Sequence, residues 1–253
     1  MNATLDGTTA LVTGASSGIG EATARVLARH GAAVAVAARR GDRLDALAAA
    51  IEAERGRTLA IEADVTDQQQ AIGAVEQTVA ELGRLDIVVN NAGVMLLGPI
   101  LDAPTEEWDR MVALNVNGLM YVAHAALPHL LRAAGDGPRH VADLVNVSSL
   151  AGRRAIRGSG VYNATKFAVN AFTEALRQEV TERHVRVSVI EPGAVTTELS
   201  SHNRPEIREQ IERTFDLERL EADDIADAIA YVVTRARRVA INEVLIRPTE
   251  QVR

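Results

Sequence analysis

Tyr162 and Lys166 are the two side chains whose types and spacing most directly indicate acid–base chemistry. They lie four residues apart in a stretch of helical period, VYNATKFAVNAFTEALRQEV, so both project from one face of the predicted helix. A phenol with its ordinary pKa of about 10 is a poor acid–base group at neutral pH, and an ammonium about 5 Å away would lower that pKa by about two units. The pair therefore predicts a tyrosine that acts as general acid or base and is activated by the lysine.

A glycine-rich turn near the start of the chain, TALVTGASSGIG (9–20), has two interpretations. Gly14-x-Ser16-x-Gly18 fits the nucleophile elbow of serine hydrolases, but that elbow needs earlier strands and a histidine in the terminal region. Here the turn follows the first predicted strand, and His202 is the only histidine beyond residue 184. The preferred interpretation is a strand-to-helix turn that approaches a pyrophosphate at the N-terminus of a helix beginning near Gly18. Its spacing differs from G-x-G-x-x-G, so other residues must support it.

Composition excludes several classes of function. The chain has 253 residues, with 27 basic and 34 acidic side chains and a net charge of −7, so it has no electrostatic footprint for nucleic acid. It has no cysteine, which excludes disulfides, thiolate metal sites and a cysteine nucleophile. None of the six histidines forms a ligand cluster, so no metal is expected. The sequence shows neither a signal peptide nor an apolar run of bilayer length, which predicts a cytoplasmic protein without a membrane partner.

Apolar runs of strand length alternate with segments of helical period. The strand-length runs cover 9–13, 33–38, 58–64, 86–93, 142–149, 185–193 and 242–248. Helical segments are expected over 18–31, 43–56, 68–83, 105–134 and 160–183. This alternation predicts an α/β protein with a doubly wound parallel sheet of about seven strands and helices on both faces. No linker-like composition interrupts it, so residues 1–253 are expected to form a single domain.

Several short motifs occur in order between about Leu5 and Arg247. They are Thr13-Gly14-x-x-x-Gly18-Ile19-Gly20, Asn90-Asn91-Ala92-Gly93, Asn115, Ser149, Tyr162-x-x-x-Lys166 and Pro192-Gly193. Taken together they resemble the short-chain dehydrogenase/reductase (SDR) family. The resemblance covers nearly the whole chain. It implies a Rossmann-type domain that binds a nicotinamide dinucleotide and transfers hydride to or from a carbonyl carbon.

The resemblance implies roles for four side chains, Asn115, Ser149, Tyr162 and Lys166, which form the expected catalytic set. In the family the tyrosine protonates the carbonyl oxygen as hydride arrives, and the lysine also holds the nicotinamide ribose. Ser149 matches the serine that hydrogen-bonds the substrate oxygen, with Ser148 as the neighbouring alternative. Asn115 matches the asparagine that braces a water beside the lysine in a proton relay.

The end of the second predicted strand indicates which nicotinamide cofactor is used. Folds that bind NAD place an acidic residue there, about 20 residues beyond the glycines, to bond the ribose 2′-hydroxyl. Ala38 holds that place and is followed by Arg39 and Arg40, whose guanidinium groups suit a 2′-phosphate. The pattern favours NADP(H), with Arg39 preferred as the phosphate ligand. The competing interpretation is that both arginines are merely solvated at the start of a helix.

The other cofactor contacts are implied by the family, position by position. They are Gly14, Ser16, Ser17, Gly18, Ile19 and Gly20 in the first turn, Asp64 and Val65 after the third strand, Asn91, Ala92 and Gly93 after the fourth, and Pro192, Gly193, Val195 and Thr197 after the sixth. Tyr162 and Lys166 complete the set. The competing interpretation of Asp64 is a helix cap.

The implied activity is reversible, NADPH-dependent reduction of the carbonyl group of a small aldehyde or ketone. The tail NEVLIRPTEQ and the phrase VMLLGPI are similar to the branch with 3-hydroxy-acid (serine-type) dehydrogenases and a clavulanate-pathway aldehyde reductase. The polar segment 198–216 falls where the family places its substrate lid, and Arg157 is a candidate partner for a substrate carboxylate. The alternative is a sensor or scaffold that binds NADP without turnover, which would be expected to have lost Tyr162 or Lys166.

Assembly is implied by the family as well. Its members commonly pair through two long helices, here 105–134 and 160–183. The apolar sequence LMYVAHAALPHLL is compatible with such pairing. A homodimer or homotetramer is therefore expected.

Overall fold

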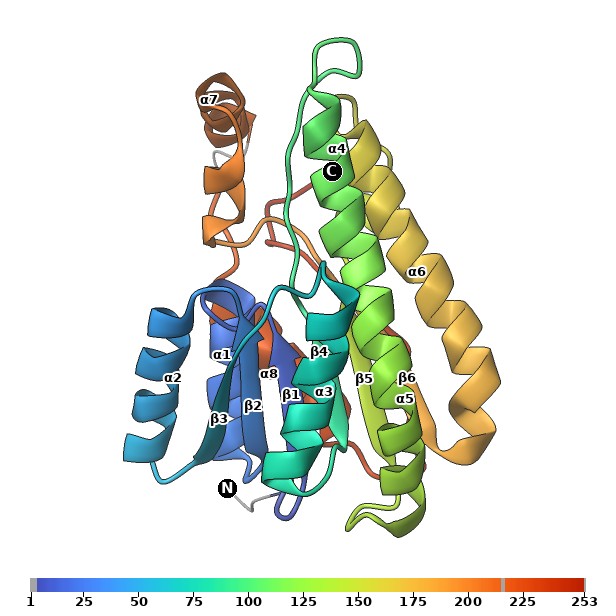
Figure 1. Cartoon of the computed structure of the whole chain (residues 1–253). Coiled ribbons are helices and arrows are strands. Elements are labelled where there is room, and N and C mark those ends of the chain that lie inside the picture. Colours follow the sequence, from blue (N-terminus) through green and yellow to red (C-terminus); the bar gives the residue numbers. More distant parts are fainter. Residues whose placement is uncertain (1–3, 215–216, 253) are drawn as a thin grey trace.

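A parallel sheet forms the centre of the molecule, as seen in a computed structural model that describes residues 4–214 and 217–252 (Figure 1). Within these residues the sheet has seven strands in the order β3-β2-β1-β4-β5-β6-β7, and every neighbouring pair is parallel. The strands are β1 (Thr9–Thr13), β2 (Ala33–Ala38), β3 (Arg57–Glu62), β4 (Ile87–Asn90), β5 (Ala142–Val147), β6 (Val185–Pro192) and β7 (Glu243–Ile246). The predicted doubly wound sheet is confirmed.

The strands are buried because their sequences are almost continuously apolar. Every residue of β1, β4, β5 and β6 is buried, as expected of parallel strands that are covered on both faces. β7, at the edge, alternates exposed and half-buried side chains. The predicted strands over 86–93 and 142–149 end earlier, at Asn90 and Val147, because most of the residues that follow line a cavity at the end of the sheet.

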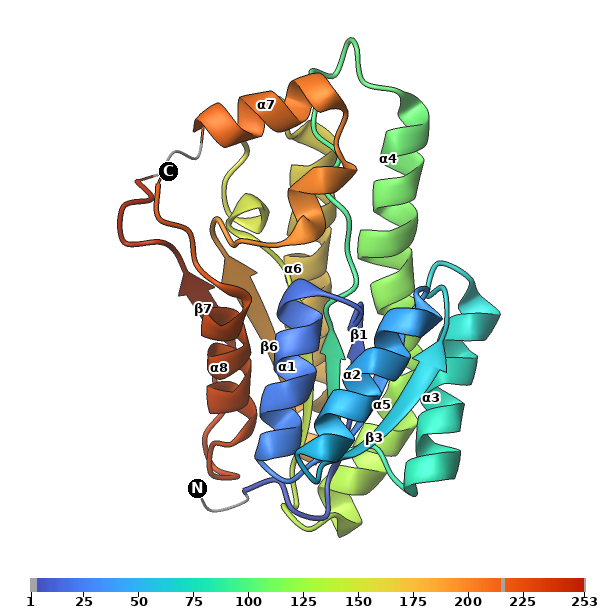
Figure 2. The ribbon, with the colours of Figure 1, turned by 90° about the vertical axis from the view of Figure 1, so that its left-hand side faces the viewer.

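Helices cover both faces of the sheet (Figures 1 and 2). One face is packed by α1 (Gly18–Arg29), α2 (Gly41–Ala53) and α8 (Ala222–Val233), and the other by α3 (Gln68–Leu82), α5 (Leu119–Asp136) and α6 (Gly160–Val180). The remaining helices are α4 (Thr105–Val112) and α7 (Pro205–Thr214), with 3-10 turns η2 (Leu150–Gly152), η3 (Thr181–Arg183) and η4 (Glu198–His202). None of the described helices is long and apolar enough to cross a bilayer.

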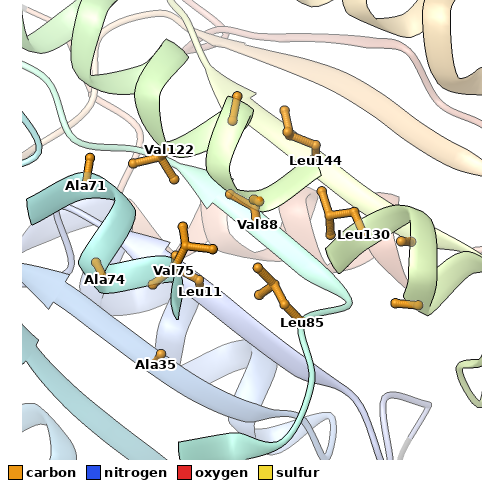
Figure 3. Close-up of a cluster of buried hydrophobic side chains, with 14 of the residues drawn as sticks. Leu11, Ala35, Ala71, Ala74, Val75, Leu85, Val88, Val122, Leu130 and Leu144 are labelled. Carbon is orange, nitrogen blue, oxygen red and sulfur yellow. The ribbon is translucent and has the colours of Figure 1, made fainter. Parts of the chain in front are cut away.

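One hydrophobic core lies between the sheet and the layer of α3, α5 and α6 (Figure 3). Leu11, Val88 and Leu144 come from the neighbouring strands β1, β4 and β5 and pack with Val75 of α3 and Leu130 of α5. Leu11, Leu130 and Leu144 are completely buried. Burying each such side chain stabilises the fold by about 1.5–3 kcal/mol. The core therefore holds the central strands in place, and the ends of these strands carry the candidate site.

The predicted helix 105–134 forms one continuous helical segment that contains a wider turn. A π-helical turn, η1 (Ala113–Gly118), joins α4 to α5. The apolar pattern does not reveal this turn, because a π turn adds only one residue to the helical repeat. Such turns occur frequently at functional sites. This one contains Asn115, a residue of the expected catalytic set.

Candidate active site

A cavity of about 790 Å³ opens at the carboxyl ends of the strands. The strand order reverses between β1 and β4, and ligands of doubly wound sheets bind at such a reversal. The cavity is lined by Gly14, Ser16, Ser17, Gly18, Ile19, Arg39, Arg40, Asp64, Val65, Asn91, Ala92, Gly93, Tyr162, Lys166, Pro192, Gly193, Val195 and Thr197, all of them predicted site residues. Three further predicted residues, Gly20, Asn115 and Ser149, are not among its lining residues.

Two glycines of the glycine-rich turn, Gly14 and Gly20, are packed so closely that neither position has room for a side chain. Gly14 has a φ of +65°, and a Cβ added there would lie 2.7 Å from Cα of Ala92. A Cβ on Gly20 would lie 2.4 Å from the carbonyl oxygen of Gly14. Asn91 donates its side-chain amide to the carbonyls of Thr13 and Gly14, at 3.0 and 3.2 Å. The turn between β1 and α1 is thus held against the loop after β4, with the positive end of α1 facing the cavity.

Tyr162 and Lys166 form part of one wall of the cavity, and Ser149 contacts Tyr162 without lining the cavity itself. Ser149 follows β5, while Tyr162 and Lys166 are buried residues of α6, one turn apart. The Tyr162 hydroxyl is hydrogen-bonded to the Ser149 side chain. Lys166 Nζ donates to the carbonyl of Val147 at 3.0 Å and lies 5.9 Å from the centroid of the Tyr162 ring. Ser148 instead donates its hydroxyl to the main-chain carbonyl of Lys166, at 3.3 Å.

Burial governs the ionisation of this pair, contrary to the expectation that Lys166 lowers the pKa of Tyr162. Burial is the largest effect and raises the pKa of the phenol to about 12, while the hydrogen bond with Ser149 acts in the opposite direction. Burial also lowers the pKa of the Lys166 ammonium to about 8. The expectation was wrong because it counted the neighbouring charge and omitted the cost of burying a phenolate. At neutral pH the phenol therefore keeps its proton.

Asn115 is buried behind the cavity wall, beside the lysine. Its Oδ1 accepts from the Val94 amide at 2.8 Å, and its Nδ2 donates to the Val94 carbonyl at 2.8 Å and to Thr165 Oγ1 at 3.2 Å. A Cβ on Gly93 would lie 3.3 Å from Asn115 Oδ1 and 3.8 Å from Lys166 Nζ. The π-helical turn therefore brings Asn115 to the lysine. There its side chain ties the loop after β4 to α6.

The two arginines after β2 are placed differently. The Arg39 side chain is 59% exposed and pairs with Asp64 Oδ2 at 3.9 Å. Arg40 is half-buried, and its guanidinium donates to Ser16 Oγ at 3.0 and 2.9 Å and to Ser17 Oγ at 2.9 Å. It also donates to Glu198 Oε2 at 2.8 Å. Both arginines line the cavity, but Arg40 is the one anchored to the glycine-rich turn.

Asp64 makes a local turn after β3 and does not cap a helix. Its Oδ1 accepts from the amide and the hydroxyl of Thr66, at 3.0 and 2.8 Å, in a local turn. The helix cap of α3 is Asp67, whose carboxylate accepts from two amides in the first turn. The competing interpretation of Asp64 as a helix cap is therefore wrong. Asp64 stays at the cavity wall, where the family places an adenine contact.

Sequence reasoning missed the residue that holds the loop 150–156. Asn163 donates its side-chain amide to the carbonyls of Ala151 and Arg154, both at 2.7 Å, and accepts from the Ile156 amide at 3.1 Å. These bonds fix the chain that follows the site serine onto α6. No spacing in the sequence identifies such a bond, because each partner is a main-chain group.

The segment 198–216 borders the same cavity as far as it is described, since residues 215 and 216 lie outside the described ranges. It forms η4 and α7, and Leu199, Ile207 and Ile211 line the cavity. Arg157 is exposed and lies at the wall. No group of three or more His, Cys, Asp or Glu side chains within the described residues could hold a metal ion.

Known proteins are similar to this chain in sequence and architecture. The family model described as short chain dehydrogenase matches residues 8–208. A glycine betaine reductase of Emericella nidulans is 39% identical over 98% of this chain, which spans only 19% of that much longer protein. An uncharacterized oxidoreductase of Staphylococcus aureus is 36% identical over 94% of this chain and 96% of its own length. The closed form of a serine dehydrogenase, solved in complex with NADP+, superposes on this chain with a TM-score of 0.86, at 31% sequence identity and with 97% of each chain covered.

Proposed function

Because the chain belongs to the short-chain dehydrogenase family, we propose that it is an NADPH-dependent oxidoreductase that reversibly reduces a carbonyl group of a small aldehyde or ketone. The observation that carries this proposal is the Ser149–Tyr162–Lys166 group, whose tyrosine and lysine line the cavity that the glycine-rich turn also lines. NADPH, when bound, supplies the hydride that reaches the carbonyl carbon.

The proton that completes the reduction comes from Tyr162. Its phenol has a pKa of about 12, so it holds a proton at neutral pH and can pass it to the carbonyl oxygen as negative charge develops there. Ser149, hydrogen-bonded to the same phenol, donates to that oxygen and fixes its position. The Lys166 ammonium stabilises the phenolate left behind, because it lies 5.9 Å from the ring. In the oxidative direction Tyr162 acts as the base.

The residues at the cavity fit a 2′-phosphorylated dinucleotide. The turn around Gly14 lines the cavity at the N-terminus of α1, a position that suits a pyrophosphate. The place of an acidic ribose ligand is held by Ala38, and Arg40 stands beside the turn with its guanidinium fixed by Ser16 and Ser17. We therefore propose NADP(H) as cofactor, with Arg40 as the main phosphate ligand and Arg39 as the secondary one. This order reverses the preference drawn from the sequence.

The substrate side of the cavity is mainly apolar, since Met95, Leu97, Leu199, Ile207 and Ile211 line it. This supports a small, largely apolar carbonyl compound, covered by the segment 198–216 as a lid. Arg157 at the wall supports a carboxylate on some substrates. A homodimer or homotetramer in the cytoplasm completes the proposal, and the exposed Val112 and Phe167, on α4 and α6, are compatible with pairing of the two long helices.

A panel of aldehydes, ketones and hydroxy acids, each assayed with NADPH and with NADH, tests this function. We expect carbonyl-dependent oxidation of NADPH, with kcat/KM about ten- to a hundredfold higher than with NADH, the range of one charge-assisted arginine–phosphate contact. Arg40→Ala should remove this preference, and Arg39→Ala, the matched control, should reduce it less. Binding of NADPH without oxidation by any compound of the panel would instead indicate the sensor or scaffold alternative.

A further inference from the structure

The Glu198 carboxylate lies between two arginines and lines the cavity described above. Its Oε2 accepts from Arg40 Nη1 at 2.8 Å, and its Oε1 accepts from Arg43 Nη1 at 2.7 Å. Arg40 in turn holds the hydroxyls of Ser16 and Ser17 in the glycine-rich turn. One anionic group thus occupies the guanidinium group of Arg40, the proposed main phosphate ligand, and that of Arg43, three residues further along the chain. A phosphate presents the same chemistry to them, with more charge and one more oxygen.

Glu198 is an anion over the whole working range of pH. The hydrogen bond from Arg43 is the largest cause, followed by that from Arg40, and together they lower the pKa of the carboxyl to about 2. The three side chains are 39 to 44% exposed, so solvent screens the pairs and each contributes little to stability. Such pairs exchange partners readily when a stronger anion arrives.

We propose that the Glu198 carboxylate competes with the 2′-phosphate of the dinucleotide for the same arginine side chains. Glu198 is therefore a residue that sets the affinity for NADP(H). The inference rests on the proposed function, because it takes the groove to bind a 2′-phosphorylated nucleotide. Binding transfers the guanidinium groups of Arg40 and Arg43 from the carboxylate to the phosphate. Breaking the two carboxylate pairs costs part of the binding energy, which weakens the affinity for the phosphorylated nucleotide alone.

Glu198 lines the cavity and begins η4, so this exchange also affects the segment that borders the cavity. Glu198 begins η4, and five residues later Asn203 binds the far wall, accepting from the Leu97 amide at 2.7 Å and donating to the Met95 carbonyl at 2.9 Å. The stretch 198–203 is therefore held at both ends across the crevice. Once the arginines bind phosphate, like charge repels Glu198, and the first of these two attachments is lost.

Calorimetric titration with adenosine 2′,5′-bisphosphate and adenosine 5′-monophosphate tests the inference, because the two nucleotides differ only in the 2′-phosphate. Glu198→Gln should strengthen binding of the bisphosphate about five- to tenfold, the sum expected for two exposed ion pairs, and change binding of the monophosphate less than about twofold. Glu206→Gln is the matched control, since Glu206 is 64% exposed in the neighbouring α7 and pairs with Arg204 at 3.5 Å. It should leave both affinities unchanged.

Hydrogen exchange of the wild-type chain provides a second readout. Saturating bisphosphate should speed exchange of the main-chain amides of 198–202, whereas saturating monophosphate should not. Two results with Glu198→Gln would overturn the inference. If both nucleotides bound more tightly by the same factor, the carboxylate would act only through the overall electrostatic potential of the cavity. If the bisphosphate bound more weakly, the carboxylate would serve to position the arginines.

The proposed function can fail separately in the same titrations. If Arg40→Ala weakens binding of the bisphosphate while Glu198→Gln does not strengthen it, the competitor role of Glu198 is wrong and the proposed NADP(H) preference stands. If wild type binds both nucleotides equally and Arg40→Ala changes neither, the preference for NADP(H) is wrong, and the competitor role is wrong with it.

Discussion

At the scale of the residue, burial sets the protonation states of the site. Tyr162 and Lys166 are both buried, and burial disfavours the charged form of each, which moves the pKa of the phenol up and that of the ammonium down. The sequence revealed the pair and its spacing, because four residues along a helix always share a face. It did not reveal the direction of the phenol's shift, which depends on how tightly the surrounding chain excludes water.

The first prediction concerns a single side chain, Lys166, and the alkaline side of the pH profile for the proposed carbonyl reduction. Lys166 is charged below its pKa of about 8 and neutral above it, while Tyr162 stays protonated until about 12. We therefore expect kcat/KM for reduction to fall above about pH 8, as the cation beside the phenol is lost. Lys166→Arg keeps a charge that does not titrate in this range, so its pH profile should lack this fall even if its maximum is lower. An identical alkaline fall in Lys166→Arg would assign the titration to another group.

At the scale of the element, many of the candidate site residues lie at the ends of strands, and one lies on an irregular helical turn. The sequence predicted the order of the elements and the turn that carries Gly14. It placed Asn91 and Ser149 inside the strand-length runs 86–93 and 142–149, whereas β4 and β5 end before them, at Asn90 and Val147. It could not predict the π-helical turn that carries Asn115. Nor could it predict that Asn163 fixes the loop 150–156, because side-chain bonds to the main chain leave no periodic signal.

Asn115→Ala tests whether the hydrogen bonds of Asn115 hold the loop after β4 against α6. The substitution leaves the buried amide and carbonyl of Val94 without their partner, so we expect the free energy of unfolding in urea to fall by about 1–3 kcal/mol. The reduction rate should fall as well, because the loop beside Lys166 loosens. Asn242→Ala, at an exposed position, is the control and should change neither quantity. Unchanged stability with lost activity would restrict Asn115 to a chemical role.

At the scale of the whole molecule, the parallel sheet and its two helical layers place residues distant in sequence around one crevice. The alternation of apolar runs with helical segments predicted this architecture, since a parallel sheet with helices on both faces buries its apolar strands on both sides. The contact of Glu198 with Arg40 joins positions 158 residues apart and follows from no local pattern. Long-range pairs between half-exposed charges are the part of the site that sequence reasoning does not reach.

Core packing makes a prediction at this scale too. Leu130→Ala should lower the free energy of unfolding by about 2–5 kcal/mol, because Leu130 is completely buried between α5 and the sheet. Leu101→Ala, at a side chain that is 93% exposed, should change it by less than about 0.5 kcal/mol. Denaturant titrations of the two variants measure both values. A small effect at Leu130 would mean that this core does not hold the layers together.

A single-turnover measurement on Tyr162→Phe tests the central claim most directly. With NADPH bound and a carbonyl substrate from the panel in excess, wild type should oxidise NADPH about a hundred- to ten-thousandfold faster than the variant, the usual contribution of a general acid. The affinity for NADPH, measured by calorimetry, should stay within about threefold of wild type, so that the loss is assigned to proton transfer. A variant that turns over at the wild-type rate would contradict the assignment of Tyr162 as the proton donor.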